Sequence, residues 1–216
     1  MVGARFVRAL EWATELHGAQ ARKGSDVPYV AHLLAVAALV LEDGGNERQA
    51  VAALLHDTLE DTGATRKELR ARFGTKVERI VVACTDVPTG KKGAKRVRRG
   101  KPLHHPGNWR KRKRRSLATL ADQSTSRAVV RVRAADALAN ARSIVADLRR
   151  FGPETWLRLN AGAVDQLWYF RSVSVIVTRR LPGLLSDELR VTVREMERLT
   201  AWWFDLGDPQ TAHRSV

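Results

Sequence analysis

The sequence predicts an all-α protein, because apolar residues recur at helical spacing and no segment alternates as a strand does. The N-terminal stretch shows the pattern, with Phe6, Leu10 and Leu16 on one face. The chain has 216 residues, of which 44% are hydrophobic, so it is long enough to bury one substantial core. We therefore expect a helical bundle that forms a single domain over residues 1–206, followed by a polar tail at residues 207–216.

The helices follow in chain order from this spacing and from the residues that begin and end them. A second helix is expected over residues 29–41, ending at the Asp-Gly-Gly sequence of residues 43–45, and a third over residues 47–59. Thr65 and Glu68 form a capping box at the start of a fourth helix. Further helices are expected over residues 76–86, from Trp109 through Leu120, over residues 127–150, from Pro153 through Phe170 to a point before Pro182, and from Ser186 through Trp203.

Composition indicates the cellular compartment of the protein. The only cysteine, Cys84, lies in an apolar stretch and is expected to be a buried free thiol. A single cysteine excludes a disulfide within the chain, which fits a reducing cytoplasm. Charges at Arg5 and Arg8 indicate that the N-terminus is not a secretion signal, and no stretch approaches the roughly 20 apolar residues of a membrane span. We expect a cytoplasmic protein without a membrane partner, and its oligomeric state stays open.

The net charge of +15 comes almost wholly from a basic insert at residues 88–116. This insert has thirteen Lys and Arg and no Asp or Glu, whereas the rest of the chain carries only +2. Glycine and proline punctuate its first part, which predicts a loop up to about Trp109. Three interpretations are open: a solvated loop, a cationic funnel for an anionic substrate, or a nucleic-acid surface on which Trp109 and the pair His104-His105 stack on bases.

Ionisable residues end the apolar sequence AVAALL of residues 50–55 abruptly. Burying several charges on a helix without compensation costs several kcal/mol per ion, and a divalent metal supplies that compensation. The candidate centre consists of His32, His56, Asp57, Glu60, Asp61 and Asp136. Each of them taken singly could be a packed histidine or a solvated carboxylate. Together they indicate a metal site between helices, and the mixed nitrogen and oxygen donors suit Mn²⁺, Fe²⁺, Zn²⁺ or Ni²⁺, with Mn²⁺ slightly favoured.

The motifs around these residues resemble those of HD-domain phosphohydrolases. More narrowly, they are similar to the (p)ppGpp hydrolase domain of RelA/SpoT enzymes and of small stand-alone alarmone hydrolases. The similarity extends over about residues 4–170. It is carried by Arg-Lys at 22–23, Pro-Tyr-Val-Ala-His at 28–32, His-Asp-Thr-Leu-Glu-Asp-Thr at 56–62, Phe-Gly at 73–74, Val-Val-Ala-Cys-Thr-Asp at 81–86 and Ala-Asp-Ala-Leu-Ala-Asn at 135–140. Two positions depart from the family pattern: Leu33 stands where proline is usual, and Ala137 replaces a lysine that could meet phosphate.

The resemblance implies a role for each candidate residue. The metal ligands would be His32, His56, Asp57 and Asp136. Glu60 and Asp61 would orient and deprotonate the attacking water. The nucleotide would be bound by Arg22, Lys23, Asn140, Tyr169, Arg112 and Lys113, although Tyr169 could instead be a core residue. The implied reaction removes the 3′-pyrophosphate from ppGpp or pppGpp and gives GDP or GTP.

Two alternatives to this reaction remain open. The chain could be an HD-family phosphatase that acts on another nucleotide, such as a nucleoside monophosphate or NADPH. It could also be a nucleic-acid-binding protein that keeps a non-catalytic HD scaffold and binds through the basic insert. The sequence does not distinguish a guanine from an adenine substrate.

Overall fold

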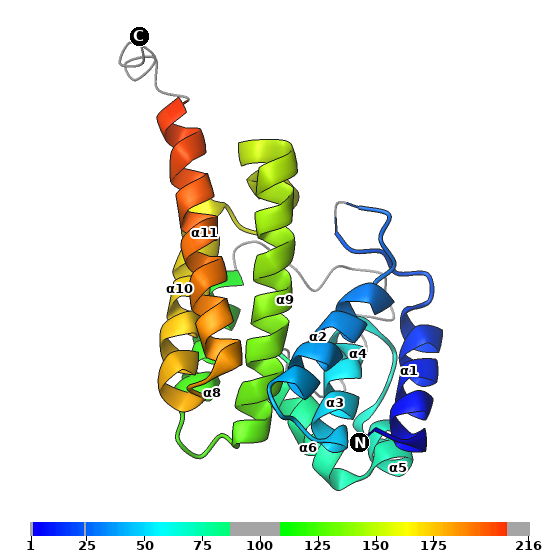
Figure 1. The fold of residues 1–216 in the computed structure, drawn as a ribbon. Helices are drawn as coiled ribbons and strands as arrows, with labels where there is room; N and C mark the ends of the chain where they lie inside the picture. Colours follow the sequence, from blue (N-terminus) through cyan, green and yellow to red (C-terminus); the bar gives the residue numbers. More distant parts are fainter. Residues whose placement is uncertain (1, 24, 87–108, 207–216) are drawn as a thin grey trace.

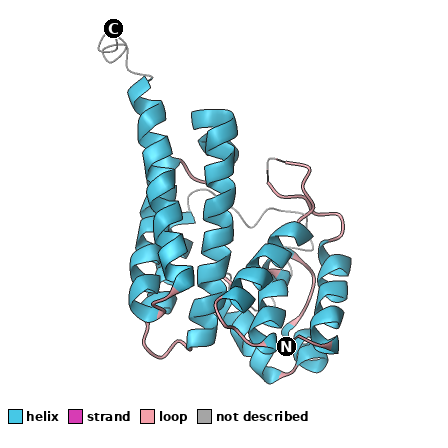
Figure 2. Ribbon diagram, in the orientation of Figure 1, coloured by secondary structure: helices cyan, strands magenta, loops and turns pink. Residues whose placement is uncertain are grey.

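The computed structural model describes residues 2–23, 25–86 and 109–206, and Figure 1 shows how they are arranged. The N-terminal helices are α1 (Ala4–His17), α2 (Val30–Glu42), α3 (Glu47–Leu54), α4 (Thr58–Asp61), α5 (Arg66–Phe73) and α6 (Thr75–Cys84). The C-terminal helices are α8 (Trp109–Ala121), α9 (Arg127–Phe151), the 3₁₀ helix η2 (Gly152–Arg158), α10 (Ala163–Arg180) and α11 (Leu184–Leu206). In these ranges a single isolated bridge joins Ala21 and Pro28 and no strand is formed (Figure 2), so the all-α prediction is confirmed.

Helix α9 lies between two groups of helices (Figure 1). On one side it packs against α2, α3 and α6, and on the other against α8, α10 and α11. Its buried residues, including Val132, Leu138 and Leu148, belong to one core that continues through both groups. Because one helix faces both groups, its polar side chains can contribute to a cavity between them.

The predicted helix at residues 47–59 is wrong in one respect, since it is broken into α3 and α4. Leu55 leaves the helical conformation at φ −109°, and its carbonyl accepts from the N–H of Thr58 at 3.1 Å and from the Thr58 hydroxyl at 2.7 Å. The fully buried Thr58 thereby satisfies a carbonyl that the helix no longer uses. As a result, His56 and Asp57 project from a turn and not from a continuous helix face.

The predicted capping box is confirmed. The N–H of Glu68 donates to Thr65 Oγ1 at 3.2 Å, and the N–H of Thr65 donates to Glu68 Oε2 at 2.8 Å. Helix α5 ends at Gly74, whose φ of 86° favours glycine. This short helix therefore begins and ends where local sequence chemistry sets it.

Two later predictions need correction. Pro153 does not begin one long helix through Phe170, because it lies in η2, and residues 159–162 separate η2 from α10. The last helix begins at Leu184, before Ser186, and the Ser186 hydroxyl accepts the Gly183 N–H at 3.1 Å from within the first turn.

Part of the predicted organisation is not tested. Residues 88–108 of the basic insert and the tail at residues 207–216 lie outside the described residues, and the single domain remains a prediction. Residues 109–116 of the insert are the first turns of α8. In the described part of the chain, no helix is long and apolar enough to cross a membrane.

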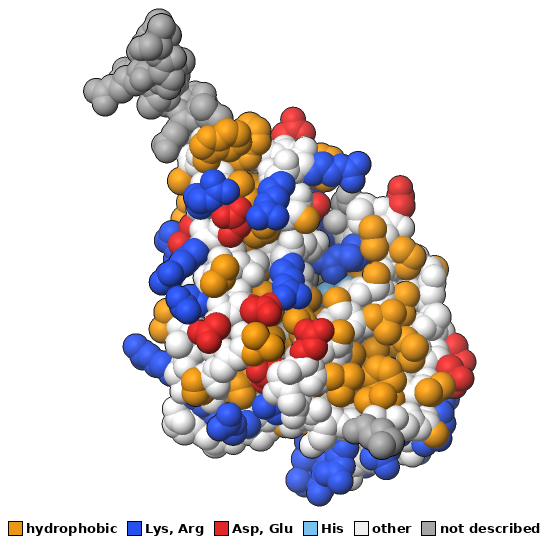
Figure 3. Space-filling model, in the orientation of Figure 1, with side chains coloured by type: hydrophobic (Ala, Val, Ile, Leu, Met, Phe, Trp, Pro, Cys, Tyr) orange, Lys and Arg blue, Asp and Glu red, His pale blue; other side chains and the backbone are white. Residues whose placement is uncertain are grey.

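The surface is uneven in character. In the space-filling view of Figure 3, apolar side chains gather over the N-terminal helices, where Val7 is 54% exposed and Leu34 is 41% exposed. Elsewhere on this face, Lys and Arg are interspersed with Asp and Glu (Figure 3).

Candidate active site

The structure brings the four predicted metal ligands together. His32 lies on α2, His56 and Asp57 on the turn after α3, and Asp136 on α9. His32 Nε2 lies 3.3 Å from Asp136 Oδ1 and 3.9 Å from Asp57 Oδ2. His56 Nε2 lies 2.9 Å from Asp57 Oδ2 and 3.6 Å from Asp136 Oδ1. Ligand atoms bound at about 2.1 Å to one ion lie roughly 3–4 Å apart. His32, His56 and Asp57 offer ligand atoms that all lie within 4.8 Å of one another, and Asp136 Oδ1 lies within 3.6 Å of both histidines.

His56 is oriented as a metal ligand by a hydrogen bond of its own ring. His56 Nδ1 is 2.8 Å from the carbonyl of Ala53, which places the proton on Nδ1 and the lone pair on Nε2. The buried Nε2 lacks a partner with hydrogen-bond geometry in the described structure, despite its contact with Asp57. A buried lone pair that faces carboxylates is satisfied by a divalent cation, so the residues present fit such an ion.

The two carboxylates of this centre are held in the ionised form. Burial alone raises the pKa of Asp57, but without a metal ion the facing His56 has a raised pKa itself, and its positive charge outweighs burial and lowers the pKa of Asp57 to about 2. The same opposition, with His32 and His56, holds the pKa of Asp136 well below its ordinary value. Tyr29 also donates from its hydroxyl to Asp57 Oδ2 at 2.5 Å. Sequence reasoning gave Tyr29 no role, although its place three residues before His32 was a signal.

Glu60 and Asp61 lie beside the metal centre, and both have raised pKa values. Loss of hydration on burial and the negative charges of Asp57 and other carboxylates raise the pKa of Glu60 to about 7. Burial and Asp57 likewise raise the pKa of Asp61 to about 6. Glu60 Oε2 accepts the N–H of Asp86 at 3.1 Å, and Asp61 Oδ2 accepts from Gln20 Nε2 at 3.4 Å. A carboxylate that titrates near neutral pH is well matched to general-base chemistry.

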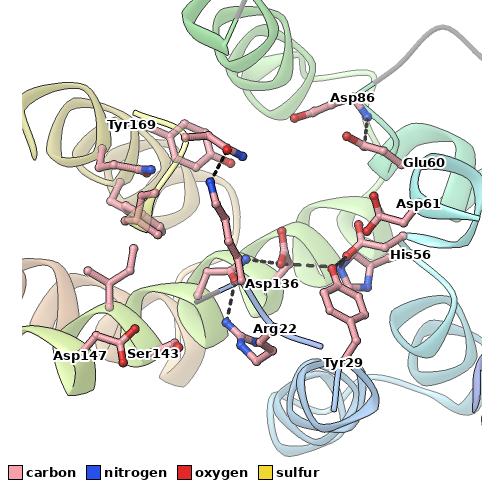
Figure 4. A pocket seen from close by; sticks show the side chains of 18 of the residues that line it. Arg22, Tyr29, His56, Glu60, Asp61, Asp86, Asp136, Ser143, Asp147 and Tyr169 are labelled. Atoms are coloured by element: carbon pink, nitrogen blue, oxygen red, sulfur yellow. Dashed lines mark hydrogen bonds and ion pairs between the residues drawn. The ribbon is translucent and has the colours of Figure 1, made fainter. Parts of the chain in front are cut away.

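A cavity of about 560 Å³ extends from this centre (Figure 4). His56, Glu60 and Asp61 line one end of it, and residues of α8, α9 and α10 continue its wall. Its volume is in the range of small-molecule sites. The site therefore joins a metal-binding cluster to a chamber of the size that a nucleotide needs.

Most of the predicted substrate residues line this cavity. Arg22 donates to Asn140 Oδ1 at 3.3 Å, and Asn140 Nδ2 donates to Asp136 Oδ1 at 2.6 Å. Lys23 donates to Asn160, and partial burial lowers the pKa of Lys23. Arg22 and Asn140 are thus connected to the candidate metal ligands by direct contact.

Lys113 and Tyr169 lie together on the opposite wall. Lys113 Nζ is 3.0 Å from Asp86 Oδ2 and 4.7 Å from the centre of the Tyr169 ring. Tyr169 is half-buried and packs edge-on against Trp109, so it is both a packing residue and a cavity residue. Arg112 is half-buried on α8 but is not part of the cavity wall.

Several residues of the wall were not predicted as site residues. They are Tyr29, Cys84, Asp86, Arg133, Ser143, Asp147 and Asn160. Cys84 is half-buried in this wall and not fully buried as expected, and burial raises the pKa of its thiol to about 11. Ser143 and Asp147 continue the spacing of Asp136 and Asn140 along α9, and this spacing was the signal that could have found them.

The chain belongs to the HD domain family, because the sequence model of that family matches residues 9–161. The predicted resemblance is confirmed by curated relatives as well. The guanosine-3′,5′-bis(diphosphate) 3′-pyrophosphohydrolase MESH1 of Xenopus tropicalis is 36% identical over 156 residues, which are 71% of this chain and 74% of that protein.

A bacterial relative matches over a shorter stretch. The guanosine-3′,5′-bis(diphosphate) 3′-pyrophosphohydrolase of Aquifex aeolicus is 46% identical over 80 residues, or 37% of this chain. That match spans 11% of the Aquifex protein, and a match to the probable GTP pyrophosphokinase of Mycobacterium leprae spans 10% of that protein. The chain therefore corresponds to a small part of these long relatives.

Solved structures share the fold. A metazoan ortholog of SpoT, described as hydrolysing ppGpp and playing a role in starvation responses, superposes with a TM-score of 0.59 at 25% identity. The match covers 95% of this chain and 97% of that one. The protein lmo0812 of Listeria monocytogenes gives a TM-score of 0.57 at 27% identity, over 80% of this chain and 98% of that one.

Proposed function

We propose that the protein is a divalent-metal-dependent phosphohydrolase that removes the 3′-pyrophosphate from (p)ppGpp. The observation that carries this proposal is the position of Glu60 and Asp61, two carboxyl groups with raised pKa values, beside a histidine–aspartate cluster at one end of a nucleotide-sized cavity. The relatives named as ppGpp pyrophosphohydrolases support the choice of substrate.

The proposed metal ligands are His32, His56, Asp57 and Asp136. Their mixed nitrogen and oxygen donors favour Mn²⁺, with other divalent transition metals as substitutes. When bound, the ion supplies positive charge that acidifies a water molecule and polarises the phosphoryl group.

The protein side chains would divide the remaining work. Glu60 or Asp61 takes a proton from the attacking water, whose oxygen adds to the phosphorus attached to the 3′ oxygen. The bond between that phosphorus and the 3′ oxygen breaks, the 3′ oxygen regains a proton, and pyrophosphate leaves. Arg22 and Lys23 are placed on the cavity wall to neutralise phosphate oxygens and orient the nucleotide.

The first experiment is an assay of pyrophosphate release from ppGpp, with Mn²⁺ and with a chelator. We expect metal-dependent conversion to GDP that is lost in Asp57→Ala. Glu60→Gln should keep the metal, measured by elemental analysis, and lose at least about a hundredfold in kcat, the range typical of a missing general base. Wild-type turnover in both variants would contradict the assigned roles.

An HD-family phosphatase on another nucleotide is the nearest alternative, and the same assay with a nucleoside monophosphate and NADPH addresses it. A nucleic-acid-binding role through the basic insert is not favoured, because the insert supplies thirteen of the net +15 charges and the rest of the chain, at +2, offers no broad basic face. Phosphate contacts release counterions, so salt-independent binding to RNA or DNA would argue against that role. We also propose a cytoplasmic location, which the free thiol of Cys84 supports.

A further inference from the structure

Helix α9 presents a stripe of four polar residues to the cavity: Asp136, Asn140, Ser143 and Asp147. The intervals of four, three and four residues keep them on one helix face. At a rise of about 1.5 Å per residue, the first and last members are roughly 16 Å apart along the helix. A nucleotide that carries a 3′ diphosphate can lie along this stripe, with its phosphates towards Asp136 and its base towards Asp147.

Asp147 is an unpaired carboxylate at the end of the cavity away from His56 (Figure 4). Among the described residues it has neither an ion pair nor a hydrogen bond. The cations that share the wall have other partners. Arg22 bonds to Asn140, Lys23 bonds to Asn160, and the guanidinium of Arg150 lies 4.8 Å from the centre of the Phe151 ring. Lys113 and Arg133 both pair with Asp86.

The carboxylate of Asp147 and the apolar residues near it are suited to a flat ring with donors on its edge. Ile144, Phe151 and Leu159 line the same cavity and supply apolar surface. A carboxylate only accepts hydrogen bonds and repels other anions. A ligand group at this end therefore needs an apolar face and N–H donors on its edge, and a nucleobase has both.

We propose that Asp147 recognises the base of the substrate and selects guanine over adenine, an inference that rests on the proposed nucleotide hydrolase function. Guanine presents N1–H and the 2-amino group side by side, so both oxygens of one carboxylate can accept from it. Adenine presents the N1 lone pair at that position, which faces the carboxylate with like polarity. Helix α9 then positions both parts of the substrate, the 3′ phosphates near Asp136 and the base at Asp147.

The test compares kcat/KM for ppGpp, its adenine analogue ppApp and its inosine analogue in wild type and Asp147→Asn. Wild type should prefer ppGpp, and the inosine analogue, which keeps N1–H but lacks the 2-amino group, should lie between the two. Asp147→Asn should reduce the preference for ppGpp over ppApp by about 10- to 100-fold, the discrimination that a bidentate contact to a base provides. Glu154→Gln is the matched control, because Glu154 is an exposed carboxylate outside the cavity wall.

Measurements of nucleotide binding test the role of Asp147 independently of the proposed reaction. Calorimetry of GDP and ADP with chelated protein should show tighter binding of GDP in wild type and a reduced difference in Asp147→Asn. An unchanged guanine preference in the variant overturns the role of Asp147, whatever the activity. Selective GDP binding that depends on Asp147, in a protein that hydrolyses no ppGpp, would uphold this inference and overturn the reaction.

Discussion

Among the individual residues, Glu60 is the clearest case of a carboxyl group whose ionised form is disfavoured by its surroundings. It is half-buried, and Asp57, Asp61 and Asp86 surround it with negative charge. The N–H of Asp86 offsets only part of this repulsion. Strain of this kind is common where a carboxyl group must exchange protons near neutral pH.

The raised pKa of Glu60 predicts how the stability of the metal-free protein changes with pH. Its pKa is about 7 in the folded protein and about 4.5 when unfolded, so the folded state retains a proton over this window. Stability should therefore fall as pH rises from 5 to 8. Glu60→Gln should remove about 1–3 kcal/mol of that fall, measured by urea unfolding in chelator at both pH values. The exposed Glu154→Gln serves as control, and equal pH dependence in wild type and Glu60→Gln would contradict the raised pKa.

At the scale of elements, Asp86 joins three helices near the site. It follows α6, and its carboxylate lies 3.0 Å from Lys113 Nζ on α8 and 3.2 Å from Arg133 NH2 on α9. Asp86 and Arg133 are largely buried, with side-chain exposures of 11% and 10%. This network fixes the start of α8 next to Glu60.

Asp86→Asn should lower the free energy of unfolding by about 1–3 kcal/mol, because it leaves two cations without their counter-charge. The matched comparison is Asp187→Asn on α11, where the carboxylate is 63% exposed and pairs with Arg190. That change should cost less than about 1 kcal/mol. Urea unfolding of both variants measures the difference, and equal losses would argue against a structural role for Asp86.

The structural features that could be predicted from the sequence are those fixed by interactions between residues close together in the chain. The box formed by Thr65 and Glu68 acts within one turn, so its sequence signature was sufficient. The break at Leu55 lacks glycine and proline and depends on a buried hydroxyl from Thr58, so spacing alone missed it. Lys113 was recognised as a site residue, but its pairing partner lies 27 residues away and could not be read from local pattern.

For the whole molecule, the candidate metal centre lies where α9 meets the N-terminal group of helices. His32 and the turn of His56 and Asp57 come from the N-terminal group, and Asp136 comes from α9. These four candidate ligands could be recognised in the sequence through their motifs, whereas the length and polarity of the cavity depend on how the groups pack. A bound ion would therefore stabilise the contact between α9 and the N-terminal group as well as the turn.

Removal of the ion should lower the melting temperature of the whole protein. At a hundred times its Kd, a ligand adds about 2.7 kcal/mol of stability, which corresponds to roughly 5–10 °C for a chain of this size. Scanning calorimetry with Mn²⁺ and with chelator measures the shift. Asp136→Ala should show little response to Mn²⁺, and a full response in this variant would exclude Asp136 as a ligand.

The continuous helix α9 also fixes the distance and the angle between the side chains at its two ends. Its register relates the position of Asp136 to that of Asp147 through unbroken helical turns. Inserting one residue between them would rotate everything downstream by about 100° and carry Asp147 away from the cavity, even if every contact elsewhere were kept. Relatives that differ in substrate length are therefore expected to change this helix by whole turns or to read the substrate from another element.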